Sequence, residues 1–234
     1  LINKKETNVG TNENASSSMN ELMNANIFDN PKPISLIQYL ANFIVETNDV
    51  ILDFFSGSAT TAHAVMKLNS EDDGNRKFIC VQLPETTDEK SEAFKAGYKN
   101  ICEIGKERIR RAGEKVKSES GKTELDIGFK VLKLDSSNIK SWDSDFENLE
   151  TNLLDAVENI KSDRNEEDLL YEILLKYGLD LTLPIEEKEV NGKKLYNIGF
   201  GALIICLDSN ISIDITDEII AIKKEYDSET TRVV

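Results

Sequence analysis

The stretch that decides the fold is VILDFFSGSATTAHAV, residues 50–65. It opens with six residues that are apolar except for Asp53, a pattern typical of a central parallel strand covered on both faces. Small and hydroxyl residues follow, and then the spacing of a helix. A carboxylate at the end of a buried strand is costly unless a donor or a cation receives its charge. The sequence therefore raises the question of what Asp53 faces.

The flanking segments extend this stretch into a larger α/β unit. KFICVQL, residues 77–83, reads as a second buried strand, so strand, helix and strand follow one another as in a parallel βαβ unit with a right-handed crossover. Upstream, residues 30–49 predict a helix with Pro33 at its first position and an apolar face made of Ile34, Ile37, Leu40, Ala41, Ile44 and Val45. Downstream, a long helix over 88–118 and a third strand over 128–135 are expected.

The ends of the chain differ in character from this unit. Residues 1–27 are polar and rich in Asn and Ser, which predicts a linker, with a short helix starting at the capping-box spacing of Ser18 and Glu21. The composition becomes polar and acidic at about residue 136, which indicates a domain boundary. The start at Leu1 and the end in the strand-like TRVV suggest a fragment of a longer polypeptide.

The segment after residue 136 predicts a small α+β module. Leu169, Leu170, Ile173, Leu174 and Tyr177 form a helical face that Gly178 ends. A hairpin is expected on the Asn191-Gly192 pair, because this dipeptide is the strongest short-range hairpin signal. ALIICLD then predicts a further strand, and TDEIIAIKKEY a final helix.

Composition excludes several classes of protein. The 234 residues carry a net charge of −15, which argues against a surface that mainly contacts a phosphate backbone. No run approaches the roughly 20 apolar residues of a membrane span. Three cysteines without a CxxC pair and a single histidine cannot form a zinc site, so no metal site is expected. Isolated cysteines in apolar stretches suggest a reducing cytoplasm.

The loop after Asp53 indicates a ligand site. In open α/β sheets, ligands bind at the carboxyl ends of the strands, and Gly57 with a helix N-terminus suits an adenine nucleotide or S-adenosylmethionine. Neither G-x-G-x-x-G nor G-K-[ST] is present. Because an acid repels a pyrophosphate but attracts an ammonium and a sulfonium, the loop favours S-adenosylmethionine, with Asp53 facing its cationic amino acid part. The alternative is that Asp53 caps the helix or accepts bonds from loop amides.

These segments resemble a known family. DFFSGSATTAHAVMKLN and NRKFICVQLPE are similar to the S-adenosylmethionine site of the Mod subunit of type III restriction-modification systems, which are site-specific DNA adenine-N6 methyltransferases of the β arrangement. FDNPKPISLIQYL, AGYKNICEIGKERIRRAGEKVK, GFKVLKLDSSNIKSWD and LLYEILLKYGLDLTLPI with GFGALIICLD also resemble that subunit. The resemblance covers about residues 9–234.

The resemblance implies a fold and a division of the chain. The fold would be α/β, an incomplete Rossmann-like S-adenosylmethionine-dependent methyltransferase sheet followed by a small α+β C-terminal domain. Residues 1–27 would be a linker from the target-recognition region, 28–135 the cofactor-binding half, and 136–234 a domain for dimerisation or subunit docking. The implied partners are DNA, through the full-length protein, a second Mod subunit in a homodimer, and the Res helicase-nuclease subunit, with no membrane.

The resemblance also assigns the residues of the cofactor site. From the loop, the opening of the helix, the end of the second strand and the segment that precedes the first helix, they are Asp53, Phe54, Phe55, Ser56, Gly57, Ser58, Thr60, Thr61, Gln82, Phe28, Lys32 and Pro33. Two positions depart from the family pattern. Ala59 replaces a frequent second glycine, and Gln82 is neutral where many methyltransferases place an acid on the ribose hydroxyls.

The catalytic motif of the family, [D/N/S]-P-P-[Y/F/W], is absent from this sequence, so no catalytic residue is assigned. In the whole enzyme that motif would hold the amino group of an adenine flipped out of the duplex. We therefore expect the 234-residue chain alone to lack methyltransferase activity and to bind the cofactor weakly or not at all.

Other interpretations remain open. The loop would bind the methyl donor and gives no information about the methyl acceptor. A methyltransferase that acts on RNA, protein or a small molecule therefore fits it too. A non-enzymatic subunit-interaction module fits residues 136–234, which carry no catalytic constellation. His63 is interpreted as a packing residue, and Trp142 as a hydrophobic anchor. The cations of KERIRRAGEKVK are interpreted as residues favoured by a helix C-terminus, with a phosphate-contacting patch as the alternative.

Overall fold

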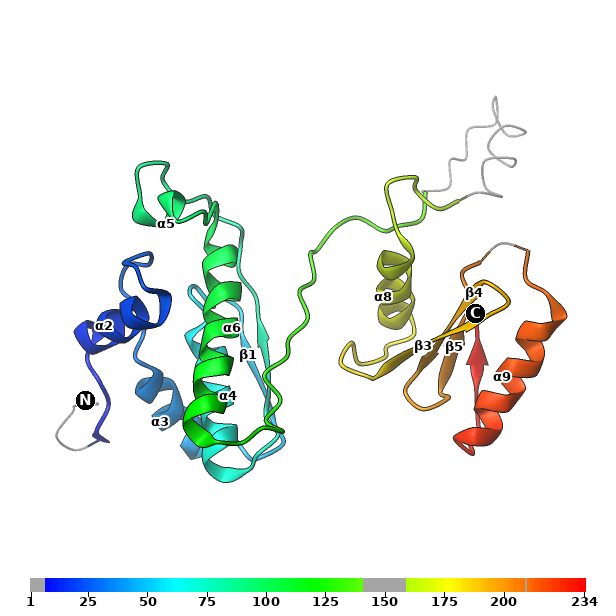
Figure 1. Ribbon diagram of the computed structural model, residues 1–234, viewed down its shortest axis with the longest axis horizontal. Helices are drawn as coiled ribbons and strands as arrows, with labels where there is room; N and C mark the ends of the chain where they lie inside the picture. The colour runs from blue at the N-terminus through cyan, green and yellow to red at the C-terminus, as the bar shows by residue number, and fades with distance from the viewer. Residues whose placement is uncertain (1–6, 141–158, 209) are drawn as a thin grey trace. The chain divides into compact units, whose positions relative to one another are not determined.

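The computed structural model describes residues 7–140, 159–208 and 210–234, and it divides into two compact units, Leu1–Val131 and Leu132–Val234 (Figure 1). The boundary predicted at residue 136 lies close to this division. Trp142 lies outside the described residues. The two units are described separately below.

The first unit contains the predicted strand, helix and strand. β1 (Val50–Asp53) is followed by α4 (Thr60–Asp72) and β2 (Lys77–Cys80), and the two strands pair in parallel with Ile51 opposite Phe78. α4 is buried along most of its length because its small and apolar side chains pack in the core. The chain therefore forms the α/β unit expected from residues 50–83.

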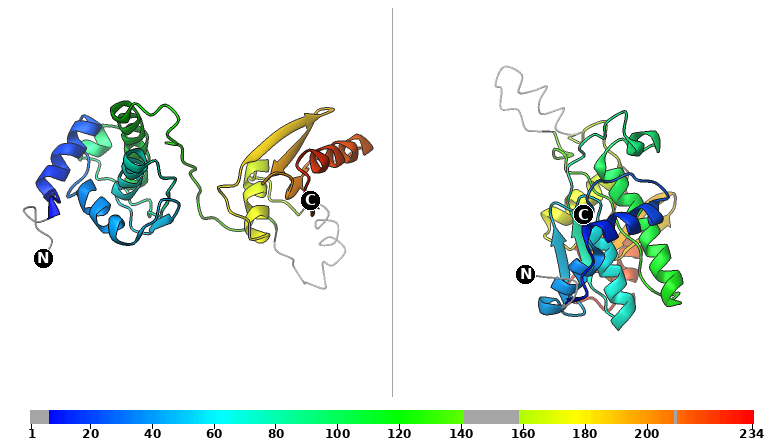
Figure 2. Two further views of the ribbon diagram at one scale, coloured as in Figure 1. Left: turned by 90° about the horizontal axis from the view of Figure 1, so that it is seen from below. Right: turned by 90° about the vertical axis from the view of Figure 1, so that its left-hand side faces the viewer.

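Two further helices pack on α4, and another packs on one of these two. α6 (Ile101–Ser120) and α3 (Ile34–Ile44) both lie against α4, and α2 (Asn12–Met23) packs on α6 (Figures 1 and 2). One core cluster joins Ala62 and Met66 of α4 to Ile109 and Ala112 of α6, and a second joins the methionines of α2 to Ile104. The helices thus bury one side of the small sheet.

The other face of the sheet is uncovered in the described residues. Phe78 and Cys80 point into the helical core, whereas their neighbours Leu52 and Ile79 are 53% and 51% exposed. The prediction that this strand is covered on both faces is wrong for the described chain. The physical reason is that successive side chains of a strand point to opposite faces, and the described helices pack against one face only.

The apolar face predicted for residues 34–45 is likewise largely exposed. Ala41 is the buried member, while Leu40 is 46% and Ile44 83% exposed. Pro33 is the N-cap of α3 rather than its first helical residue. Its extended ψ of 133° leaves it outside the helix, so the position predicted for it is one residue too far in.

The N-terminal segment is a corrected prediction. α2 starts at Asn12, with Thr11 and Asn14 forming the capping box, instead of starting at Ser18. Met19 and Met23 are almost fully buried against the second core cluster. Residues 12–23 are therefore part of the folded unit and not a linker, because the apolar stripe of α2 is buried against α6.

The long helix predicted over 88–118 is broken into α5 (Glu92–Lys95) and α6. Gly97 has φ of +95°, which ends α5, and the side chain of Asn100 accepts a hydrogen bond from the Glu103 N–H at 3.1 Å. An N-cap of this kind starts a new helix. The break was missed because the apolar spacing continues through both helices.

Residues 128–135 do not form the predicted third strand. Phe129 packs against the core of α4 and α6, but Leu134 is fully exposed and no strand of the described residues pairs with this segment. Alternation alone does not make a strand, because the backbone N–H and C=O groups need a neighbouring strand to pair with.

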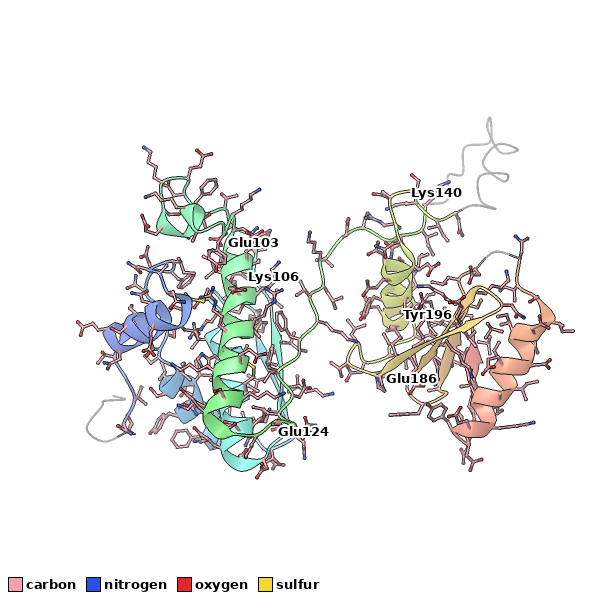
Figure 3. All side chains as sticks on the ribbon, viewed as in Figure 1. Glu103, Lys106, Glu124, Lys140, Glu186 and Tyr196 are labelled. Carbon is pink, nitrogen blue, oxygen red and sulfur yellow. The ribbon has the colours of Figure 1, made fainter. Side chains whose placement is uncertain are left out.

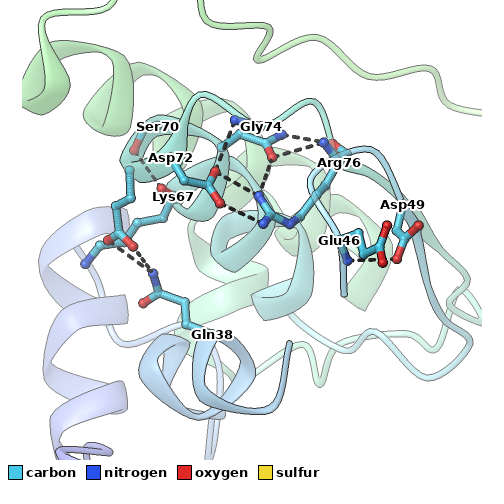
Figure 4. A network of polar contacts seen from close by, with 10 residues as sticks. Gln38, Glu46, Asp49, Lys67, Ser70, Asp72, Gly74 and Arg76 are labelled. Atoms are coloured by element: carbon cyan, nitrogen blue, oxygen red, sulfur yellow. Dashed lines mark hydrogen bonds and ion pairs between the residues drawn. The ribbon is translucent and has the colours of Figure 1, made fainter. Parts of the chain in front are cut away.

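A polar network fixes the junction between α4 and β2 (Figure 4). The buried guanidinium of Arg76 donates to both Asp72 carboxylate oxygens at 2.9 and 2.7 Å, and the Asn69 side chain exchanges bonds with the Arg76 backbone. Asp49 accepts a bond from the Glu46 N–H at 2.8 Å just before β1. These contacts lie at the amino ends of the two strands, and the carboxyl ends are not part of this network.

In its described residues, 132–140, 159–208 and 210–234, the second unit contains a four-stranded sheet and two helices. Its strands, β3 (Ile185–Val190), β4 (Lys193–Ile198), β5 (Leu203–Ile205) and β6 (Arg232–Val233), lie in that order, with β6 parallel to β5. α8 (Glu166–Lys176) packs on one core cluster and α9 (Ile213–Glu225) on another. The described residues of this unit thus combine helices and strands.

The turn chemistry of this unit is as expected. Asn191 and Gly192 both have positive φ, +51° and +78°, as a two-residue type I′ hairpin requires. α8 is capped by Asn165 and ends before Gly178, which also has positive φ.

Two tyrosines are tied to carboxylates in this unit. The Tyr196 hydroxyl donates to Glu166 at 2.9 Å, and the Tyr226 hydroxyl donates to Glu186 at 2.8 Å (Figure 3 labels Tyr196 and Glu186). Burial and the neighbouring Glu166 raise the pKa of Tyr196 to about 12.

Among the described helices, none is long and apolar enough to cross a membrane.

Leu174 tests the core of the second unit. Leu174 is fully buried and its neighbour Leu175 is 63% exposed, on the same helix. We expect Leu174→Ala to lower the free energy of unfolding of this unit by about 2–5 kcal/mol, and Leu175→Ala by less than about 0.5 kcal/mol. Urea unfolding followed by circular dichroism measures both, and equal losses would contradict this account of the core.

His63, the single histidine, is a packing residue of the first unit. It lies in α4, is 7% exposed, and its Nδ1 has no hydrogen-bond partner among the described residues. Burial, with smaller contributions from Arg108, Lys67 and Lys115, lowers its pKa to about 3. A neutral buried imidazole agrees with packing, not with the transfer of a proton near pH 7.

This depressed pKa predicts a pH dependence of stability. Between pH 6.5 and about 3, His63 is protonated in the unfolded chain and neutral in the folded chain. The free energy of unfolding therefore falls as the pH falls. From pH 7 to pH 5 the expected loss is about 2 kcal/mol, and His63→Leu should remove it. The imidazole proton resonances of the folded chain should not titrate between pH 8 and 5; a midpoint near 6.5 in those spectra would overturn the assignment.

Candidate cofactor-binding site

The candidate site lies where β1 passes into α4. Residues 54–59 link the two elements at the carboxyl end of β1, and because β1 and β2 are parallel, the residues after Cys80 reach the same edge. The Ser56 N–H donates to the Val81 carbonyl at 3.2 Å, which holds the loop against the end of the second strand. We call residues 54–59 the cofactor loop.

Two residues of the cofactor loop adopt the left-handed conformation. Gly57 has φ of +51° and Ala59 has φ of +60°. A methyl group added at Gly57 would lie 3.4 Å from Phe28 Cζ, so glycine serves both the turn and this close approach. Ala59 is held by a bond from its N–H to the Ser56 carbonyl at 2.7 Å. The left-handed φ at Ala59 explains why a glycine suits this position.

Asp53 binds the loop and the helix that follows. One carboxylate oxygen accepts a bond from the Thr61 hydroxyl at 2.5 Å, and the other accepts one from the Phe55 N–H at 3.2 Å. These are the contacts of the alternative in which Asp53 receives donors of its own chain. Each oxygen of an ionised carboxylate can accept about two bonds, so Asp53 keeps capacity for a further donor.

Gln82 is joined to the same loop. Its side-chain oxygen accepts the Gly57 N–H at 2.8 Å, and its side-chain nitrogen donates to the Leu83 carbonyl at 3.2 Å. The Cys102 thiol donates to the Gln82 carbonyl at 3.3 Å, which links this residue to α6. Gln82 therefore lies at the site, where it fixes the conformation of Gly57.

The remaining predicted residues divide into near and distant ones. Phe28 lies near the loop, with its Cζ 3.4 Å from where a methyl group at Gly57 would be. Phe54 and Phe55, 59% and 85% exposed, form an edge-to-face pair with ring centroids 5.9 Å apart. Lys32 is exposed and Pro33 is buried. In the part of the chain that is described, no hydrogen bond joins either of these last two to the loop.

Arg108 of α6 is a residue of the site that the sequence reasoning missed. Its guanidinium is buried, and Nη1 donates to the hydroxyls of Ser58 and Thr60, both at 2.7 Å. The helical spacing could have found it, since Arg108 falls on the same face as Gly105 and Ala112. It was instead grouped with the cations of KERIRRAGEKVK.

The other arginines of that segment are paired with acids. Arg111 bonds Glu107 at 2.8 Å and donates to the Leu22 carbonyl at 3.3 Å, and Arg110 lies 3.6 Å from Glu107. A shallow hollow of about 450 Å³ is lined by Leu22, Asn24, Glu107, Arg110, Arg111 and Glu114. Its charges balance, so neither the arginines nor the hollow supports the phosphate-contacting alternative. Figure 3 shows this helix with Glu103 and Lys106 labelled.

Comparison with known proteins agrees with the geometry. Residues 3–112 match the family N6_N4_Mtase, described as DNA methylase. The chain is 42% identical over 123 residues to the type III restriction-modification enzyme StyLTI Mod subunit of Salmonella typhimurium, which is 53% of this chain and 19% of that protein. It is 36% identical over 169 residues to the EcoP15I Mod subunit of Escherichia coli, 72% of this chain and 25% of that protein.

A third relative is the EcoPI Mod subunit of Escherichia phage P1, 40% identical over 118 residues, 50% of this chain and 18% of that protein. The chain thus spans a quarter or less of the length of these curated relatives. The resemblance to type III Mod subunits expected from the sequence is confirmed, and residues 3–112 match the family model described as DNA methylase.

Proposed function

We propose that this chain supplies the methyl-donor half of a site-specific DNA adenine-N6 methyltransferase of a type III restriction-modification system. The observation that carries the proposal is the cofactor loop, with its left-handed Gly57, at the carboxyl end of β1 in the segment that matches DNA methylases. Ligands of open α/β sheets bind at this edge. The sheet would be the incomplete Rossmann-like sheet of that enzyme.

The residues of the loop fit S-adenosylmethionine. This cofactor supplies an electrophilic methyl group on a sulfonium ion. Asp53 would accept a bond from the ammonium group with the capacity that Thr61 and Phe55 leave. Gly57 would allow close approach of the backbone, and Gln82 would bind ribose hydroxyls with the lone pair and the N–H that its bonds to Gly57 and Leu83 leave.

The uncovered face of the sheet supports the proposal that a further part of the methyltransferase packs against it. Val50, Leu52, Ile79 and Val81 are 48–55% exposed on one face, and the outer edge of β1 has no partner strand among the described residues. We assign to this face the part of the methyltransferase that carries the [D/N/S]-P-P-[Y/F/W] motif and holds the adenine. The 234-residue chain alone would then transfer no methyl group, and methylation of DNA by it would refute this assignment.

The second unit would serve subunit pairing. Its described residues hold no cluster that could bind a metal ion, and the bond of Tyr226 to Glu186 joins two residues of this same unit at its surface. We propose that residues 136–234 form the domain that pairs two Mod subunits or docks the Res subunit. The net charge of −15 agrees with DNA being bound mainly by other parts of the enzyme.

Asp53 provides the test of the cofactor proposal. S-adenosylhomocysteine, added to millimolar concentration, should shift the backbone amide resonances of residues 53–61 and Gln82 in the parent chain, even if binding is weak. Asp53→Asn should lower the affinity derived from these shifts about tenfold, because it removes one charge-assisted bond to the ammonium group.

Asp49→Asn is the matched control. Asp49 is an exposed acid directly before the same strand, at its opposite end. This variant should retain the response of the parent chain. Equal weakening by both variants would indicate a general effect of charge, and resonance shifts outside the loop, or none at millimolar ligand, would reject the site.

A further inference from the structure

Arg108 joins α6 to both sides of the left-handed residue in the cofactor loop. Its Nη1 lies 2.7 Å from Ser58 Oγ, 2.7 Å from Thr60 Oγ1 and 3.4 Å from the Ser58 carbonyl oxygen. Ser58 and Thr60 flank Ala59, whose φ is +60°. One nitrogen therefore connects the residue before and the residue after the turn that opens α4.

Ala59 needs such support from its surroundings. A left-handed conformation is less favourable for alanine than the right-handed one, because it brings Cβ close to the following carbonyl oxygen. As the N-cap of α4, Ala59 has no side chain to accept a bond from the first turn. The hydroxyls of Ser58 and Thr60 are themselves buried, so their positions are set by what they bond inside the protein.

The charge of Arg108 has no acidic partner in the described residues. All three of its hydrogen bonds go to neutral oxygens, and its Nε is buried without a partner. Burial lowers the pKa of the guanidinium to about 10, which leaves it charged at pH 7. An apolar side chain of similar volume would fill this space without burying a charge, so packing does not explain an arginine here.

The close packing of α6 on the loop keeps Arg108 in reach. A methyl group at Gly105, one turn earlier in α6, would lie 3.4 Å from the Gly57 carbonyl oxygen and 3.6 Å from Ala59 Cβ. The helix and the loop thus touch at Gly105 and are joined by hydrogen bonds at Arg108. The same face of α6 bears Cys102, whose thiol bonds the Gln82 carbonyl.

We propose that Arg108 is a positioning residue of the cofactor site, which fixes Ser58 and Thr60 and thereby holds the cofactor loop in the conformation that receives the ligand. The proposal rests on the proposed function for the identity of the ligand. The restraint on the loop is a property of the chain alone.

The test compares Arg108→Met, Arg108→Lys and Arg111→Met in the 234-residue chain. Arg111 lies on the same helix. Its substitution removes an ion pair with Glu107 and a hydrogen bond to the Leu22 carbonyl, neither of which involves the loop. Amide hydrogen exchange at Ser56, Gly57 and Ala59, all hydrogen-bonded, reports the loop, and the Lys77 amide, bonded to the Asp49 carbonyl, is the reference at the other end of the sheet.

We expect Arg108→Met to speed exchange in the loop at least tenfold more than at Lys77, because it removes charged bonds to two buried hydroxyls. Arg108→Lys should restore most of the protection, since both hydroxyls are bonded by one nitrogen that an ammonium group could replace. Arg111→Met should change loop and reference amides alike. Affinity for S-adenosylhomocysteine should fall about tenfold with Arg108→Met and less than threefold with Arg108→Lys.

A purely structural Arg108 predicts another pattern. Arg108→Met would then accelerate exchange equally at the loop and at Lys77, and that result would overturn the proposal. If Arg108→Met does not fold, the pair Ser58→Ala and Thr60→Val removes the same bonds from the loop side and must loosen the loop selectively. If the parent chain gives no ligand response, the proposed function fails while the exchange measurement still decides the role of Arg108.

Discussion

The first unit depends on how the carboxyl end of β1 is held. Three polar side chains from three elements converge on the cofactor loop: Asp53 from β1 bonds Thr61, Gln82 beyond β2 bonds Gly57, and Arg108 from α6 bonds Ser58 and Thr60. Each bond reaches a different part of the turn. The loop therefore has a defined shape before any ligand arrives, and a preorganised site does not lose binding energy to ordering the loop.

The two interpretations of Asp53 turn out to be compatible. The bonds from the Thr61 hydroxyl and the Phe55 amide fix the carboxylate at the strand end, and the remaining lone pairs stay available for a cation. A carboxylate without these bonds would be free to rotate away from the ligand. Positioning by its own chain is what a binding role for Asp53 requires.

The sequence predicted those features that depend on local chemistry. The βαβ unit follows from the apolar runs around Asp53, and the hairpin follows from Asn191-Gly192, because only such residues accept its positive φ values. Predictions failed where the outcome depended on distant partners. The segment 128–135 alternates like a strand but finds no neighbour, and the break at Gly97 lies inside a continuous apolar spacing.

The candidate site shows the same division. Asp53 and Gly57 were proposed from their places at and after the end of a strand, whereas Arg108 was missed because its partners lie some fifty residues earlier in the chain. A charged residue on the apolar face of a helix is the signal that identifies such a side chain. Pairing cannot be read from spacing, so this signal points to burial and leaves the partner open.

The uncovered sheet face explains why one prediction about β1 failed. A run of six residues that is apolar except for Asp53 encodes a strand with a layer on each side, and the described helices provide one of those layers. Leu52 and Ile79, adjacent in the pairing register and half exposed, have the composition of a core without its second wall. Exposed apolar patches of this kind mark interaction surfaces. The pattern of β1 thus supports, independently of the cofactor loop, the proposal that a further methyltransferase layer completes this sheet.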